Sequence, residues 1–97
     1  MSVKNGLKNM LQYIKDFAED EDINLQETFA IMESFEYDEE KLSNEAIDAM
    51  SEEEAKSLLF DVNYVAINEL FGGDFETWNY TLEAFGFDEE TIDFLNY

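Results

Sequence analysis

The chain has 97 residues, of which 25 are Asp or Glu and five are Lys, and its formal net charge is −20 at pH 7. A chain this acidic lacks the basic face with which proteins hold nucleic-acid phosphates or anionic lipids, so we expect neither direct nucleic-acid binding nor membrane binding. Because Cys and His are both absent, the sequence also excludes the common zinc sites, thiol chemistry and a Ser-His-Asp triad.

The apolar content nevertheless predicts a folded chain. Hydrophobic residues make up 45% of the sequence and aromatic residues 15%, whereas disordered acidic chains are poor in both. This is enough apolar surface for one core at this length. No apolar run approaches the ~18 residues of a membrane span, and the start of the chain lacks the apolar stretch of a secretory signal. We therefore expect one soluble, cytoplasmic domain over residues 1–97.

Helical spacing begins close to the start of the chain. A first amphipathic helix is predicted by five apolar residues at helical spacing, namely Leu7, Met10, Leu11, Ile14 and Phe17. The acidic run 19–22 ends this helix. A second helix is predicted to begin after Asn24, which forms a capping-box pattern with Glu27. The apolar face of this second helix comprises Leu25, Phe29, Met32 and Phe35.

The middle of the chain predicts a short helix followed by a long one. The short helix covers about residues 44–50. Ser51 and Glu54 then form a second capping-box pattern, which marks the start of the long helix. Its apolar residues continue as far as the glycine pair 72–73, a typical C-terminal stop.

Two further helices are predicted before the C-terminus. Asp74 is placed to cap the fifth helix, Gly86 ends it, and Asp88 opens a last short helix. The alternation of apolar and polar residues that marks a strand is not sustained anywhere in the sequence. The predicted fold class is therefore all-α: a compact single-domain bundle of five to six short helices.

Two segments of the chain resemble each other weakly. Residues 32–42 and 82–92 match at an offset of 50. Each predicts a helix that ends on Phe, a tight turn with a further aromatic residue, and an Asp cap followed by two Glu. The match has two interpretations: a helical corner used twice, or a duplicated unit with internal pseudo-symmetry.

One acidic segment begins like a calcium-binding loop. Asp20, Asp22 and Asn24 have the spacing of the first three ligands, but the loop requires Gly at its sixth position and Glu at its twelfth, and this chain has Leu25 and Ile31 there. The segment is better interpreted as an acidic junction between two helices. Carboxylates are abundant, but a small helical chain offers little room for a catalytic cleft. We expect no enzymatic activity, metal or cofactor.

The charge is distributed unevenly along the chain. Residues 1–18 carry a net +2, residues 19–55 a net −14, and residues 57–97 a net −9 with no basic residue. Rows of carboxylates on helices can imitate the closely spaced phosphates of DNA. The predicted partner-binding residues are nine acids of the central block together with one tyrosine: Glu33, Glu36, Asp38, Glu39, Glu40, Asp48, Glu52, Glu53, Glu54 and Tyr37.

Exposed aromatic residues are expected to add contacts that charge alone does not supply. The candidates are Tyr37, Tyr64, Trp78, Tyr80 and Tyr97, of which Trp78 fits a core position better.

The whole profile, short, acidic, rich in aromatic residues and free of Cys, is similar to that of the DNA-mimic inhibitors of phages and mobile elements, the anti-CRISPR and antirestriction proteins among them. The resemblance implies an inhibitor that occupies the basic DNA- or RNA-binding surface of a CRISPR effector or restriction enzyme in a bacterial cytoplasm. The partner would be a basic nucleic-acid-binding protein. The oligomeric state stays open, with a dimer as one option.

Other interpretations of the same sequence stay open. One is an immunity protein, also small, acidic and helical, that neutralises a nuclease toxin. Another is an adaptor domain without inhibitory activity, and a third is an acidic surface that serves solubility alone. Salt distinguishes them in part, because binding driven by charge weakens as ionic strength rises.

Overall fold

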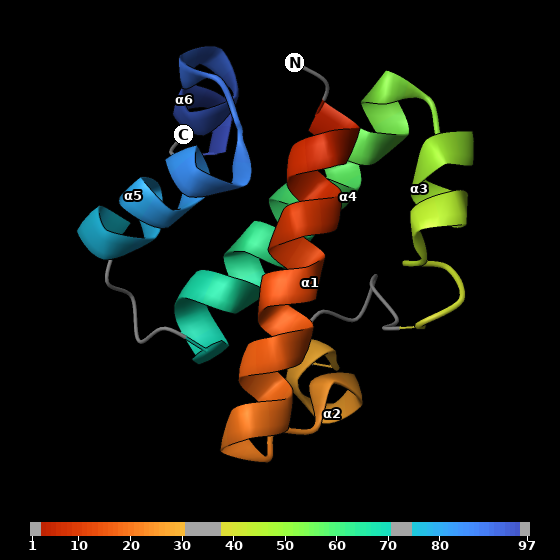
Figure 1. The fold of residues 1–97 in the computed structure, drawn as a ribbon, viewed down its shortest axis with the longest axis vertical. Helices are drawn as coiled ribbons and strands as arrows, with labels where there is room; N and C mark the ends of the chain where they lie inside the picture. Colours follow the sequence, from red (N-terminus) through yellow and green to blue (C-terminus); the bar gives the residue numbers. More distant parts are fainter. Residues whose placement is uncertain (1–2, 31–37, 71–74, 96–97) are drawn as a thin grey trace.

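The computed structural model describes residues 3–30, 38–70 and 75–95. In these ranges it contains six α-helices and one π-helical segment, and no strand. The elements are α1 (Val3–Glu21), α2 (Leu25–Phe29), α3 (Asn44–Ala49), α4 (Glu52–Val65), the π-helical segment η1 (Ala66–Leu70), α5 (Phe75–Phe85) and α6 (Glu89–Leu95) (Figure 1). The all-α fold class is confirmed.

Helix α1 is the longest described element, and α3, α4 and α5 pack against it. Figure 1 shows α1 crossing in front of α4, between α3 and α5. Its buried face holds the predicted apolar residues except Phe17, which is half-buried. The buried residues are Val3, Gly6, Leu7, Met10, Leu11, Ile14 and Ala18.

The end of α1 lies within the acidic run that was predicted to end it. The helix continues through Glu21, and the chain reverses at Asp22, whose φ of 55° is left-handed. Two backbone bonds close this end: the N–H of Ile23 donates to the carbonyl of Ala18, and the N–H of Asp22 to that of Glu19. This pair of bonds is a Schellman motif. Helix α5 ends in the same way at Gly86, with φ 101°.

Side-chain caps begin four of the helices, and three of them were predicted. Asn24 accepts the N–H of Glu27 at 3.3 Å, Ser51 that of Glu54 at 3.1 Å, and Asp88 that of Thr91 at 2.8 Å. The fourth cap, Ser43 at the start of α3, was not predicted. The predicted Asp74 cap lies outside the described residues. So do Met32 and Phe35 of the second predicted helix.

The predicted long fourth helix is divided into two parts. The α-helix ends at Val65, and Ala66–Leu70 continues as a π-helix, which the prediction of one unbroken helix missed. The side-chain amide of Asn68 donates to the carbonyl of Tyr64 at 2.8 Å. In an α-helix that carbonyl would accept the backbone N–H of Asn68; here it accepts the side-chain amide of the same residue.

The core joins α1, α4 and α5 through a buried polar contact and a group of aromatic rings. The Trp78 indole N–H donates to Asn63 Oδ1 at 2.5 Å, and both side chains are buried. Trp78 packs edge-on against Phe85, which in turn packs against Phe87. Asn9 of α1 donates to the carbonyl of Phe85 at 2.8 Å. Trp78 is therefore a core residue, as its helical position indicated.

The two segments of the weak repeat share one turn among their described residues. The carbonyls of Asp38 and Asp88 each accept the N–H four residues later at 3.0 Å, and each carboxylate accepts a nearby backbone N–H. After Asp88 the chain continues as α6, whereas after Asp38 it makes only a turn before Ser43 starts α3. The first half of the earlier segment lies outside the described residues, so the duplicated unit stays a prediction.

Candidate partner-binding surface

The predicted acidic residues fall into two separate groups. Asp38, Glu39 and Glu40 lie in the turn before α3, and Glu52, Glu53 and Glu54 form the first turn of α4. These two groups lie at opposite ends of α3 in chain order, with Asp48 between them near the end of α3. Glu33, Glu36 and Tyr37 lie outside the described residues. That these acids form one partner-binding surface stays a prediction.

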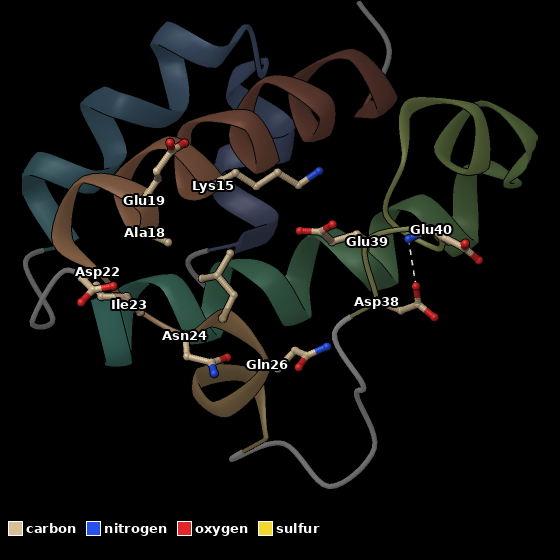
Figure 2. Close-up of a pocket in the computed structure, with 11 residues that line it drawn as sticks. Lys15, Ala18, Glu19, Asp22, Ile23, Asn24, Gln26, Asp38, Glu39 and Glu40 are labelled. Atoms are coloured by element: carbon tan, nitrogen blue, oxygen red, sulfur yellow. Dashed lines mark hydrogen bonds between the residues drawn. The ribbon is translucent and has the colours of Figure 1, made fainter.

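The first group borders a cavity of about 940 Å³. Its walls are the second half of α1, the connection to α2, the start of α2 and the turn 38–40 (Figure 2). Five carboxylates line it, those of Glu19, Asp22, Asp38, Glu39 and Glu40. Lys15 is the one basic residue of the lining, and Figure 2 shows Lys15 and Glu39 pointing toward one another. The potential inside is therefore negative, which favours a cationic group.

The turn beside this cavity is held by its own hydrogen bonds. Asp38 accepts the backbone N–H of Glu40 at 2.8 Å, and the N–H of Leu42 donates to the carbonyl of Asp38. Leu42 is buried in the core, which anchors the turn, while the side chains of Glu39 and Glu40 remain exposed. Within the described ranges, no group of three or more acidic residues is arranged to hold a metal ion. The Asp20–Asn24 segment is the helix junction that the sequence indicated.

The second group spreads around the end of a helix. Glu52, Glu53 and Glu54 are all exposed, and the N–H of Glu54 donates to the Ser51 cap. Consecutive residues on an α-helix point about 100° apart, so the three carboxylates cover most of the circumference of the first turn. They interact favourably with the positive end of the helix dipole. This arrangement offers negative charge in several directions instead of one row.

Asp48 differs from the other predicted acids because it is already paired. Lys8 of α1 forms an ion pair with its carboxylate at 2.5 Å, and Lys4 donates to its backbone carbonyl at 3.2 Å. These two contacts tie α1 to α3. A partner would have to displace Lys8 to bind this carboxylate. The contacts of Asp48 therefore stabilise the packing of α3 on α1.

The structure adds three exposed aromatic residues that the sequence interpretation missed, Tyr13, Phe60 and Phe94. Phe60 of α4 and Phe94 of α6 are 40% and 42% exposed, and their rings meet edge-to-face with centroids 6.0 Å apart. Phe60 falls outside the apolar stripe of α4, and that mismatch was the available signal. Of the predicted aromatic residues, Tyr64 and Tyr80 are exposed. Tyr37 and Tyr97 lie outside the described residues.

Two carboxyl groups have shifted acidity. Burial raises the pKa of Asp61, which lies beside Phe60 on α4. The hydroxyl and backbone N–H of Thr91 lower the pKa of Asp88, because both donate to its carboxylate. The raised pKa of Asp61 follows from its partial burial on α4. The lowered pKa of Asp88 follows from its role as the cap of α6.

None of the described helices combines the length and the apolar character needed to cross a membrane. Comparison of the chain with protein families, curated proteins and solved structures finds no match.

Proposed function

We propose that this chain is a nucleic-acid mimic: an acidic protein that occupies the basic nucleic-acid-binding surface of another protein and thereby inhibits it. The class of target that the sequence profile resembles is a CRISPR effector or a restriction enzyme. The chain itself would be a binding protein and not an enzyme.

The observation that carries the proposal is the contrast in exposure between acidic and basic side chains. Every described Asp and Glu except Asp38 and Asp61 is exposed. The three lysines of α1 are only half-exposed, and two of them, Lys4 and Lys8, are bound to Asp48. Lys41 and Lys56 are exposed, but the exposed carboxylates far outnumber them, so the surface that a partner meets is strongly negative.

The magnitude of the charge also supports a binding role. Solubility of a small domain requires a net charge of only about 2–8, and this chain carries −20. The excess costs stability through self-repulsion. A basic groove attracts such a surface over long range and raises the association rate. The carboxylates would compete there with phosphates, which DNA presents at about one charge per 1.7 Å of axis.

The experiment is a displacement assay on a defined panel of basic proteins. The panel contains a CRISPR effector loaded with guide RNA, a restriction endonuclease and a nuclease toxin, each bound to a fluorescent nucleic-acid duplex. At about 0.05 M salt the chain is expected to release the duplex from at least one of them, and about 0.5 M salt is expected to abolish the effect. Release from the toxin alone would favour the immunity protein. If the chain releases no duplex, or if release persists unchanged at high salt, the proposal is wrong.

A matched pair of variants tests whether the charge acts locally. The first variant changes Glu52, Glu53 and Glu54 to Gln, and the control changes Glu69, Glu76 and Glu83 to Gln. Both remove three exposed charges, so any difference reflects position. The first variant is expected to raise the concentration needed for release more than the control does. Equal effects would show that only the total charge matters. Circular dichroism checks that both variants fold.

A further inference from the structure

The strongest unused feature of the surface is an aromatic patch that bridges two helices. It consists of Phe60 and Tyr64, one turn apart on α4, and Phe94 on α6. The two Phe rings touch edge-to-face, and Tyr64 is exposed as well. We call these three residues the aromatic patch. Exposed aromatic rings in contact with one another mark an interaction site more often than a single exposed ring does.

The core does not need these rings. On α4 the buried residues are Ala55, Leu59, Val62, Asn63 and Val65, and on α6 they are Thr91 and Leu95. Each ring of the Phe pair is therefore adjacent in sequence to a side chain that already fills the core, Leu59 beside Phe60 and Leu95 beside Phe94. The pair lies outside that core, and about two fifths of each residue is exposed.

The charges around the aromatic patch determine what can cover it. Asp61 follows Phe60, Asp93 precedes Phe94, and Glu90 lies one turn before Phe94 on α6. Lys56 lies one turn before Phe60 on α4. The border is therefore negative overall. A second copy of the chain, with its own charge of −20, would be repelled.

We propose that the aromatic patch is an anchor for a basic partner, and that it inserts into an apolar depression bordered by Lys and Arg side chains. The inference builds on the proposed function, because the partner is the same basic protein. The carboxylates would steer the partner and the rings would hold it. Aromatic residues at the centre of an interface commonly contribute most of its affinity, whereas exposed charges contribute chiefly to the rate of encounter.

This division of roles has a measurable signature. Replacing both rings, in the variant F60A/F94A, is expected to weaken binding about tenfold or more. The loss should be the same at every salt concentration, because no charge is removed. The Glu52–Glu54 variant should instead flatten the dependence of affinity on salt. Y80A is the matched control, since Tyr80 is, at 69%, the most exposed aromatic side chain among the described residues and lies on α5.

The test uses two synthetic helical peptides of equal positive charge, so that it does not depend on finding the natural target. One peptide carries Leu and Trp between its Lys residues, and the other carries Ser and Gln. Isothermal titration should show tighter binding of the apolar peptide to the wild-type chain and to Y80A, and equal binding of both peptides to F60A/F94A. If the wild-type chain does not distinguish the peptides, or F60A/F94A still does, the proposal is overturned.

Two controls separate this result from other outcomes. Sedimentation of the wild-type chain should show a monomer, and a dimer that F60A/F94A disrupts would assign the aromatic patch to a second copy and overturn the proposal. If the peptides are distinguished as expected but the chain displaces no nucleic acid in the panel, the mimic function fails while the anchor stands. Circular dichroism checks that F60A/F94A folds.

Discussion

The close approach of α1 to the α5–α6 connection depends on Gly6, and its replacement by Ala gives the sharpest test of the packing. Gly6 is buried within α1. A Cβ at this position would lie 2.6 Å from Cδ1 and 2.8 Å from Cζ of the Phe87 ring, and closer still to Cε1. Phe87 is itself buried and packs against Phe85, so its ring has little freedom to move away.

Two opposing effects determine the result of Gly6→Ala. In the interior of an unhindered helix, Ala is favoured over Gly by about 1 kcal/mol. Forcing a methyl group into a filled core costs about 1–3 kcal/mol. All three ring carbons would lie closer to the added Cβ than other atoms lie to a Cβ in real structures. We therefore expect the clash to exceed the gain, and the free energy of unfolding to fall by up to about 2 kcal/mol. For a domain of this size that corresponds to a decrease in Tm of several degrees.

The assay is urea unfolding followed by the fluorescence of Trp78, the only tryptophan of the chain, and by circular dichroism. Phe87→Leu supplies a background in which a shorter, more flexible side chain can turn away from the methyl group. Gly6→Ala should stabilise that background and destabilise the wild-type chain. If Gly6→Ala stabilises the wild-type chain as well, the close packing of Phe87 on Gly6 is refuted.

Three further predictions concern single contacts and the charge. Asn63→Ala leaves the buried Trp78 N–H without its acceptor, so unfolding free energy should fall by about 1–3 kcal/mol in urea titrations; no change would mean that the bond is dispensable. The lowered pKa of Asp88 stabilises the fold above the ordinary pKa of 3.8, and this contribution disappears as pH falls through the shifted value. The Tm deficit of Asp88→Ala should therefore be largest near neutral pH and shrink in acid, and a constant deficit would contradict this. Raising salt should increase the Tm of the wild-type chain, because it screens the repulsion among its carboxylates; a falling Tm would show that attractive pairs such as Lys8–Asp48 dominate.

Local chemistry allowed much of the fold to be predicted from sequence. The caps at Asn24, Ser51 and Asp88 depend on a side chain and an N–H three residues later, so a short stretch of sequence contains all the information required. The apolar stripe of α1 follows from helical geometry in the same way. The π-helical turns of η1 escaped prediction because the apolar spacing through Leu70 fits an α-helix equally well.

The surface was harder to predict because its properties arise between distant residues. Asp48 is ion-paired with Lys8, which lies 40 residues earlier, and periodicity within one helix cannot indicate such a pair. The contact between Phe60 and Phe94 joins two helices whose relative placement only the fold determines.

The stability of this fold and its proposed activity respond to the same charge in opposite ways. The apolar core accounts for folding. The radius of gyration of the chain is 12.5 Å, close to the ~13 Å expected for a folded chain of this length, so the chain is compact despite the repulsion. The exposed carboxylates contribute little to that core, and most oppose compaction. A partner with a basic groove would relieve the repulsion on binding. Salt should therefore stabilise the free chain and weaken the complex, whereas a surface that served only solubility would show the first effect without the second.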